Sequence, residues 1–395
     1  MFDKQTTILS DRITIHSHFK ELSGNIPPSH SFFLQKEYLE AVEEAAIPGV
    51  EYRYIPYLKQ GRVEGLYYFQ IINLSAQELG QIVHFEPYNK LLSGLSMLLQ
   101  NLLFGVKKDK PHYLIISGSM CLSGDYGIGR LSSDDKSIYA NFPHALAQLR
   151  HELERNGKVV AEIIKDFPVD SDPLHTILKP AYYHHLAMDP IMKMAIRPEW
   201  GSISDYVDAL SSKYRQRFNQ AKKKLGHCEI RTLDTPFIIE NRERINELYT
   251  AVQEKSPVRI IKPDVNYIIS LSKHLGEKVD IRGLFYNNEL IAFLIGIQDE
   301  DHFEAHHIGI DYHHNKEFSL YLNILYLYIE MAIDVKARGV SFGRTALEMK
   351  TTVGAVSYPY NAYIKLNNRL LNGVLKKLLP ENISEDWIPR DPFRQ

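Results

Sequence analysis

The stretch 280–310 reads DIRGLFYNNELIAFLIGIQDEDHFEAHHIGI. It contains three apolar runs, which cover residues 281–286, 290–297 and 303–310. Asn287 and Asn288 separate the first two runs, and three acidic residues separate the second from the third. Because asparagine adopts turn conformations readily and each run has the length of a strand, this pattern predicts an antiparallel meander of three strands.

The residues after the meander predict alternating helices and strands. Residues 318–335 are apolar almost all round, which is typical of a helix that is buried on most sides. We expect a short strand at 340–342, a short helix that ends near Lys350, and a further strand at 362–365.

The first half of the chain repeats this order. It predicts a hairpin over 52–72, a helix at 90–104, a strand at 113–116, a helix at 135–155 and a strand at 159–165. We therefore expect an α/β (α+β) fold of two related units, each with a mixed, mainly antiparallel central sheet flanked by helices. The expected domains are 1–197 and 198–395, since 395 residues are many for one hydrophobic core.

The composition indicates a globular protein without a global electrostatic preference. With 46 basic and 48 acidic residues, the net charge of −2 gives no general attraction to nucleic acid or to an anionic membrane. Cys121 and Cys228 lie far apart, so we expect no disulfide framework, no metal site and a cytoplasmic location. We also expect no signal peptide and no membrane span, because the longest apolar run is too short.

A glycine-rich segment follows the strand expected at 113–116. Residues 117–129 contain four glycines, and glycine allows backbone N–H groups to approach an anion closely. The spacing fits neither the P-loop nor the dinucleotide-binding fingerprint. A surface turn is therefore the favoured interpretation, and a ligand-contacting loop is the alternative.

A basic helix is the clearest charged feature of the sequence. The segment 205–225 has apolar residues at every third or fourth position and carries six cations within a dozen residues. Such a face suits phosphates, and Lys213, Arg215 and Arg217 are the candidates for substrate contact. The alternative is a solvated helix face that contributes only solubility.

Two titratable side chains in the last strand of the meander are the candidates for catalysis. Strand alternation places Glu304, His306 and Ile308 on one face and His307 on the other. Burying such groups is costly without partners, so Glu304 and His306 are a candidate site pair, and we predict that His306 or Glu304 accepts the proton of an attacking amine. The alternative is a core histidine with a carboxylate partner. Adjacent histidines that point in opposite directions argue against zinc.

Residues after the strand expected at 340–342 complete the candidate site. Arg344 and Thr345 lie where a strand end meets a helix start, which is the usual place for a ligand in an open α/β sheet. Thr345 could equally act only as a helix cap. The further candidates for substrate contact are Glu348, Lys350, Tyr358 and Tyr360, and the two tyrosines could instead pack the loop.

These motifs resemble a known family. The basic segment 213–217, the run 342–350 and the dipeptide Gly354-Ala355 are similar to the FemAB-like, peptidoglycan-biosynthesis branch of the GNAT acyltransferase superfamily. The resemblance implies two GNAT-like domains and transfer of an acyl or aminoacyl group to an amine. The donor would be acyl-CoA or aminoacyl-tRNA, and the acceptor a cell-wall precursor or a small metabolite.

The resemblance also implies where a cofactor would bind. In a GNAT core, the cofactor's pyrophosphate lies at the N-terminus of the helix after the meander, where Lys316 would meet it, with Arg344 and Thr345 as further anchors. Residues 311–317 lack the family's glycine-rich pattern, and no long helical hairpin for tRNA is inserted in the second half, so the donor stays open. The alternative function is a non-catalytic GNAT-fold protein that binds a phosphorylated ligand.

Overall fold

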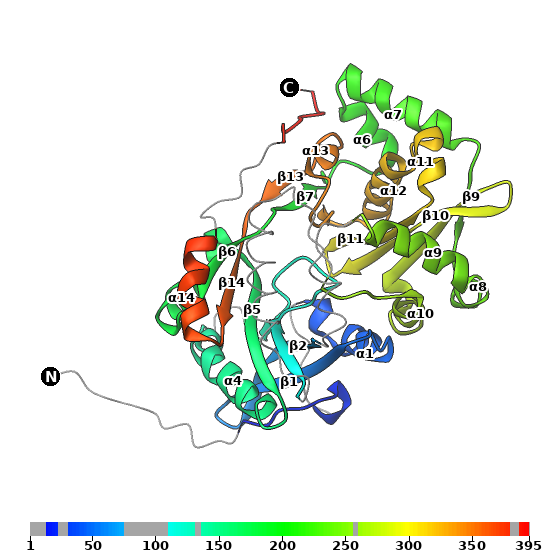
Figure 1. The fold of residues 1–395 in the computed structure, drawn as a ribbon. Coiled ribbons are helices and arrows are strands. Elements are labelled where there is room, and N and C mark those ends of the chain that lie inside the picture. The colour runs from blue at the N-terminus through cyan, green and yellow to red at the C-terminus, as the bar shows by residue number, and fades with distance from the viewer. Residues whose placement is uncertain are drawn as a thin grey trace.

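The computed structural model describes residues 13–22, 31–74, 110–130, 136–255, 260–379 and 387–394. Over these residues the chain forms two mixed sheets of seven strands each, flanked by helices (Figure 1). The predicted α/β class with two mixed sheets is therefore confirmed. The helix expected at 90–104 lies outside the described residues.

The first sheet has the strand order β1-β2-β3-β5-β14-β6, and β4 pairs with β2. Its strands are β1 (Val50–Lys59), β2 (Arg62–Asn73), β3 (His112–Ser117), β4 (Ile128–Arg130), β5 (Lys158–Pro168), β6 (His184–Ala187) and β14 (Tyr360–Leu366). The expected hairpin is confirmed as β1 and β2, and the expected strands as β3 and β5. Helix α4 (Ser137–Leu153) packs on one face together with α5 (His175–Leu178), and α14 (Arg369–Leu378) packs on the other.

The second sheet has the strand order β13-β7-β12-β11-β10-β9-β8. Its strands are β7 (Ile191–Ala195), β8 (Glu229–Thr232), β9 (Val279–Tyr286), β10 (Glu289–Asp299), β11 (His302–Ile310), β12 (Gly339–Ser341) and β13 (Val356–Tyr358). The predicted meander is confirmed as β9, β10 and β11, which pair antiparallel in sequence order.

Helices cover both faces of the second sheet. One face packs against α6 (Ile203–Ala209), α7 (Ser212–Leu225) and α12 (Leu320–Asp334), with α11 (Tyr312–Phe318) and α13 (Leu347–Thr351) beside them. The other face packs against α8 (Thr235–Glu240), α9 (Arg242–Gln253), α10 (Val265–His274) and α1 (Lys36–Glu44). Figure 1 shows α12 and α9 on opposite sides of β10 and β11.

The single helix expected at 205–225 is wrong, because the structure divides it into α6 and α7. Leu210 leaves the helical conformation with a ψ of 146° and pairs with Phe393 in an isolated bridge. The amide of Ser211 donates to the carbonyl of Pro392. The end of the chain thus supplies the hydrogen bonds that interrupt the helix, and nothing within 205–225 indicates this.

Strands β7 and β14 lie in the sheet of the other half of the chain. Figure 1 shows β14 between β5 and β6 of the first sheet, although it is synthesised after the whole second meander. The strand expected at 362–365 is therefore confirmed as β14, but it belongs to the first sheet and not to the sheet of the meander. Ala362 and Ile364 are buried on one face and Tyr363 on the other, so the strand fits the middle of a sheet. The domain boundary expected at residue 197 stays a prediction, because each sheet contains strands from both sides of this residue.

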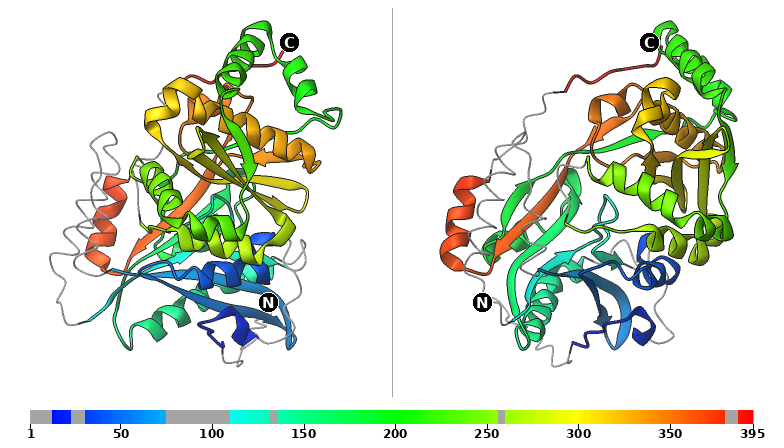
Figure 2. Two further views of the ribbon diagram at one scale, coloured as in Figure 1. Left: turned by 90° about the vertical axis from the view of Figure 1, so that its right-hand side faces the viewer. Right: turned by 45° about the vertical axis from the view of Figure 1, so that its right-hand side comes forward.

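The two halves share one hydrophobic core. Helix α1 of the first half lies against α10 of the second (Figures 1 and 2). The hydroxyl groups of Tyr38 and Tyr267 are 3.0 Å apart, and Ser270 donates to the carbonyl of Ala41 at 2.7 Å. These buried polar contacts fix the register of the two helices within an apolar interface.

The glycine-rich segment is a buried loop, so the surface turn favoured from the sequence is wrong. The ammonium of Lys165 donates to the carbonyls of Ser119 and Leu122, at 2.7 Å each. The amide of Gly124 donates to Asp166 at 3.0 Å. A buried lysine and a buried aspartate from β5, which no local pattern reveals, therefore hold the loop against the first sheet.

Gly127 is a packing requirement of this loop. A Cβ atom at this position would lie 2.4 Å from Ser117 Oγ and 2.9 Å from the amide nitrogen of Gly118. We expect Gly127→Ala to lower the free energy of unfolding by about 1–3 kcal/mol, measured by urea denaturation. The control is Gly373→Ala in α14, where a Cβ meets nothing within 4 Å and stability should rise by about 0.5–1 kcal/mol. Equal stabilities for the two variants would contradict this account.

Candidate active site

Strands β11 and β12 part soon after they meet. They pair in parallel only from His302 to Glu304, opposite Gly339 to Ser341. Among the described strands, none pairs with residues 305–310 on this side of β11. Because every second residue of a strand directs its N–H and C=O to the same edge, this edge offers backbone donors and acceptors to a ligand.

A β-bulge lies at the point of separation. Leu294 pairs with Ile308 but Gly296 pairs with Ala305, so His306 and His307 together occupy the place opposite one residue. Their imidazole rings stack with centroids 4.0 Å apart and planes inclined by 12°. Both rings therefore lie on the same face of the sheet. The alternation predicted from the sequence is wrong at these residues because the bulge interrupts it.

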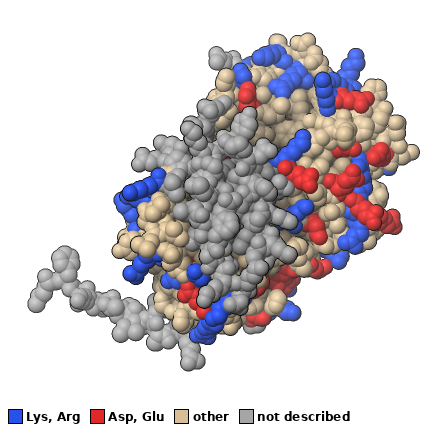
Figure 3. Space-filling model, viewed as in Figure 1, with Lys and Arg blue, Asp and Glu red and all other residues tan. Residues whose placement is uncertain are grey.

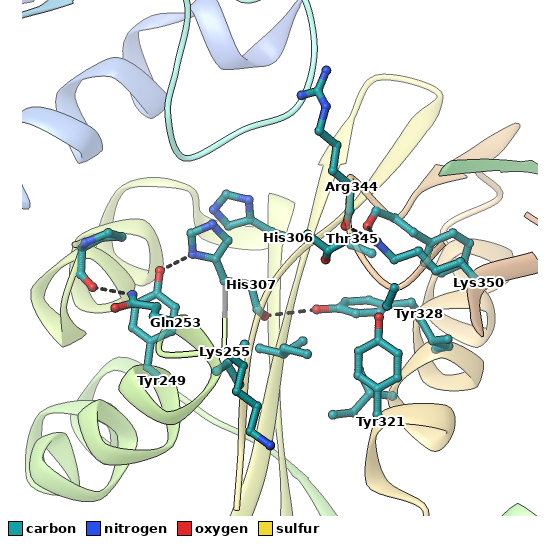
Figure 4. A pocket seen from close by; sticks show the side chains of 18 of the residues that line it. Tyr249, Gln253, Lys255, His306, His307, Tyr321, Tyr328, Arg344, Thr345 and Lys350 are labelled. Carbon is teal, nitrogen blue, oxygen red and sulfur yellow. Dashed lines mark hydrogen bonds between the residues drawn. The ribbon is translucent and has the colours of Figure 1, made fainter. Parts of the chain in front are cut away.

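A cavity of about 520 Å³ opens at the gap between β11 and β12. Tyr249 and Gln253 of α9 line it on one side of the sheet, and Tyr321 and Tyr328 of α12 line it on the other (Figure 4). Met120 of the glycine-rich loop contributes to the first side. The cavity therefore passes through the plane of the sheet.

His307 is held by hydrogen bonds at both ring nitrogens. Its Nε2 lies 3.1 Å from the carbonyl oxygen of Cys121, which can only accept, so Nε2 carries the proton. Its Nδ1 therefore accepts from the hydroxyl of Tyr249. Burial lowers the pKa of His307 to about 4, so the ring is neutral at pH 7. The ring serves to join α9, the bulge and the glycine-rich loop.

His306 has one ring nitrogen available. Its Nε2 lies 2.8 Å from the hydroxyl of Tyr267, and no described residue bonds to its Nδ1. Burial lowers the pKa of His306 well below its usual range, with a smaller contribution from His307. A neutral imidazole with a free nitrogen on a cavity wall can accept a proton from a bound substrate.

Arg344 connects the two sheets. Its guanidinium donates to both carboxylate oxygens of Asp166, at 3.1 and 2.7 Å, and to the carbonyl of Asp189 at 2.7 Å. Asp166 is fully buried and also pairs with Lys165 at 2.7 Å. Burial alone would raise the pKa of Asp166, but the two cations hold it below its usual value. Arg344 lines the cavity, and it shares the single negative charge of Asp166 with Lys165.

Lys350 lies in the wall of the same cavity and is only 4% exposed. Its ammonium donates to the carbonyl oxygens of Phe342 at 2.6 Å, of Gly343 at 3.3 Å, and of Arg344. Burial lowers the pKa of Lys350 to about 7. The side chain predicted to contact a substrate thus shapes the loop that follows β12.

Glu304 is buried but does not line the cavity. It lies in a row with Ser341 of β12 and Lys193 of β7, on the face of the sheet that packs against the first half. Burial raises the pKa of Glu304 to about 8, although Lys193 and Lys350 oppose this shift. The carboxyl group is therefore protonated at neutral pH, and the structure does not bring it to His306 as the sequence predicted.

Stability near neutral pH should depend on Glu304. Its folded pKa of about 8 exceeds its ordinary value of 4.5, so its stabilising contribution is complete below pH 4.5 and is lost as the pH rises to 8. In the wild type, the free energy of unfolding should fall by ~1.4 kcal/mol per pH unit within this window, and Glu304→Gln should abolish this fall. Urea unfolding at several pH values tests this, and parallel pH profiles for the two proteins would contradict it.

The basic residues predicted on one helix lie outside the cavity. Figure 3 shows cations gathered at the end of the molecule where α7 lies. Arg215 donates to the carbonyls at the end of α6, and Lys213 is exposed above the ring of Tyr214. Lys316 is exposed on α11. Lys213 and Lys316 thus lie on exposed helix surfaces, and Arg215 links α6 to α7.

The other predicted substrate residues form two separate groups. Arg217 and Glu348 line an open cavity of about 500 Å³ beside Trp387, where Glu348 pairs with Arg390 at 2.7 Å. Tyr358 and Tyr360 flank Lys193, whose ammonium donates to the hydroxyl of Tyr360 at 2.7 Å. Of the predicted site residues, the principal cavity brings together His306, Arg344, Thr345 and Lys350.

Comparison with known proteins identifies the architecture. No protein-family model and no curated protein matches the sequence. Among solved structures, the crystal structure of FemX is similar at 11% identity, over 88% of this chain and 95% of that chain, with a TM-score of 0.53. The fold is GNAT-like and of the FemAB type.

Two further structures are similar with lower scores. A tandem GNAT protein from the clavulanic acid biosynthesis pathway is 10% identical over 89% of this chain and 92% of its own, with a TM-score of 0.47. L-PGS from Bacillus licheniformis is 9% identical over 84% and 90%, with a TM-score of 0.46. The similarity to FemX shows the fold alone, so the substrates have to be argued from the site.

The residues at the start of α12 do not fit the pyrophosphate of an acyl-CoA. In a GNAT-like fold that group would bind the free N–H groups of this helix. Here the side chain of Asn315 already accepts from the amide of Tyr321 at 3.0 Å, and α11 directly precedes α12. Ser319, with a φ of 50°, links the two helices and leaves no glycine-rich loop between them.

The described residues contain no group of three or more His, Cys, Asp or Glu side chains that could hold a metal ion. Among the described helices, none combines the length and the hydrophobicity needed to cross a membrane.

Proposed function

We propose that the protein transfers an activated acyl group to an amine across the gap between β11 and β12. The observation that carries this proposal is the cavity that passes through the sheet at the gap, with His306 on its wall. Donor and acceptor can then reach the same point from opposite faces of the sheet. Holding two reactants in this way converts a bimolecular step into an effectively unimolecular one.

The chemistry follows from the groups at the gap. The amine nitrogen attacks the donor's carbonyl carbon, a C–N bond forms, and the bond from carbon to the leaving oxygen or sulfur breaks. The N–H groups on the open edge of β11 stabilise the developing oxyanion. His306 Nδ1 accepts the proton that the amine loses and returns it to the leaving group, so the imidazole ends the reaction neutral.

The hydrogen bonds of His306 suit this role. When Tyr267 donates to Tyr38, its oxygen accepts from Nε2–H of His306, and Nδ1 then carries the lone pair. The low pKa of His306 makes the imidazolium short-lived, which favours passing the proton on to the leaving group.

An aminoacyl ester is the donor that we favour over acyl-CoA. The amide capped by Asn315 argues against a pyrophosphate at α12. The resemblance of the segments 213–217 and 342–350 to FemAB-like enzymes implies transfer from charged tRNA to the amine of a cell-wall precursor or small metabolite. Glu304, Lys193 and the exposed cations of α7 then have no part in the chemical step.

Product analysis with two donors tests the proposal. The purified protein is incubated with tRNA charged with labelled amino acids, or with acetyl-CoA, together with amines that include a peptidoglycan precursor. Mass spectrometry should find a new amide from the ester donor alone. An amide from acetyl-CoA alone would overturn the choice of donor. If neither donor is consumed and neither binds in calorimetry, the transfer function is wrong.

A further inference from the structure

The protonated form of Lys350 is buried and has no carboxylate of the described protein to neutralise it. Its ammonium forms no ion pair with any described carboxylate and contacts only neutral carbonyl oxygens. Glu304, the acid that raises the pKa of Lys350, is itself protonated at neutral pH. A buried charge is costly unless another charge compensates it, so this wall of the cavity favours an anion.

The loop held by Lys350 presents free backbone amides. Phe342, Gly343 and Arg344 all direct their carbonyls at the ammonium, and the described peptide bonds are all trans. In a planar trans peptide the N–H points opposite to the C=O, so the amides of Gly343, Arg344 and Thr345 point away from Lys350. None of the amides of residues 343–346 bonds to a described residue.

The loop has an irregular backbone conformation. Gly343, Thr345 and Ala346 have φ values of 64°, 68° and 47°. Successive N–H groups of such turns can face a common centre and form an anion-binding concavity. A β-branched residue rarely adopts such a φ, so Lys350 and the surrounding contacts hold Thr345 there.

The loop faces the substrate cavity. Arg344, Thr345 and Ala346 line it, and no aspartate or glutamate is among its described lining residues. Figure 4 shows Thr345 between His306 and Lys350. Arg344 shares the Asp166 carboxylate with Lys165, whereas Lys350 has no carboxylate partner among the described residues, so this wall carries more positive than negative charge.

We propose that the backbone amides of residues 343–346, backed by the Lys350 ammonium, bind an oxyanion of the amine acceptor. The ligand group is a carboxylate or a phosphate monoester, and the acceptor is therefore an anionic amine. This inference rests on the proposed function only where it names the ligand as the acceptor of the transfer. The anion site itself can be measured without any transfer.

Anion binding to the free protein tests the site. Sulfate represents the phosphate monoester and acetate represents the carboxylate, and each is titrated by calorimetry at fixed ionic strength. The charge of sulfate does not change with pH near neutrality. We expect one of them to bind with at least tenfold higher affinity to the wild type than to Lys350→Met, which keeps most of the side-chain volume. The control is Lys193→Met, which removes a half-buried lysine that does not line the cavity and should bind the anion as the wild type does.

A second measurement uses only the wild type, in case Lys350→Met fails to fold. An oxyanion favours the protonated lysine, so its affinity should be constant below pH 6 and should fall as the pH rises from 7 to 9. An affinity that is flat across this range, or equal in Lys350→Met and the wild type, overturns the site. Anion binding without amide formation would uphold the site and count against the transfer function alone.

Discussion

Glutamine in place of His306 should slow acyl transfer by about 10² to 10⁴ fold, which is the usual contribution of a general base. Glutamine keeps a polar group within reach of Tyr267 but cannot accept a proton. The measurement is the single-turnover rate of amide formation at saturating donor, followed from pH 6 to pH 9. Donor affinity should stay close to that of the wild type, because His306 acts on the proton and not on the donor.

His307→Gln provides the matched control, since His307 stacks on His306 but has both nitrogens bonded within the protein. We expect it to lower the melting temperature, because it loses contacts to α9 and to the glycine-rich loop, and to leave the shape of the pH–rate profile unchanged. A wild-type rate in His306→Gln, or the same altered profile in both variants, would remove His306 from the proton path.

Asparagine in place of Asp166 should lower the free energy of unfolding by about 3–5 kcal/mol, the cost of leaving a buried charge without its partner. The substitution leaves Lys165 and Arg344 facing each other, with side chains only 7% and 13% exposed. It also weakens the attachment of the glycine-rich loop, whose Gly124 amide donates to the same carboxylate. Urea unfolding at pH 7 measures the loss.

Glu348→Gln is the comparison for Asp166→Asn. It breaks an ion pair with Arg390 in which both side chains are well exposed, at 49% and 38%. Solvent screens such a pair, so its loss should cost only ~0–1 kcal/mol. Similar losses of unfolding free energy in the two variants would mean that the cluster of Lys165, Asp166 and Arg344 becomes hydrated and does not join the two sheets as described.

The sequence predicted the elements whose patterns are local. The meander follows from three apolar runs and two turns, and α12 follows from residues that are apolar on all sides. The sheet that β14 joins could not be predicted in this way. A strand buried on both faces fits the middle of either sheet, and its partners in β5 and β6 lie far away in the sequence.

The residues that line the cavity were predicted in part, for a similar reason. His306, Arg344, Thr345 and Lys350 were recognised because titratable or turn-forming residues stood next to strands. The bulge was missed because a bulge depends on the register of two strands, and either strand alone reads as regular alternation. The tyrosines of α9, α10 and α12 could not be assigned to the site from the sequence either, because a tyrosine on an amphipathic helix is usually an ordinary core residue.

The first sheet cannot close until β14 has left the ribosome. Strand β5 is complete at Pro168, but its neighbour begins only at Tyr360, after the last strand of the second sheet. At 5–20 residues per second, synthesis of the intervening chain takes about 10 to 40 s. During this time β5 presents an unpaired edge to other nascent chains. The strands of the second sheet are all made before β14, which then completes the first sheet.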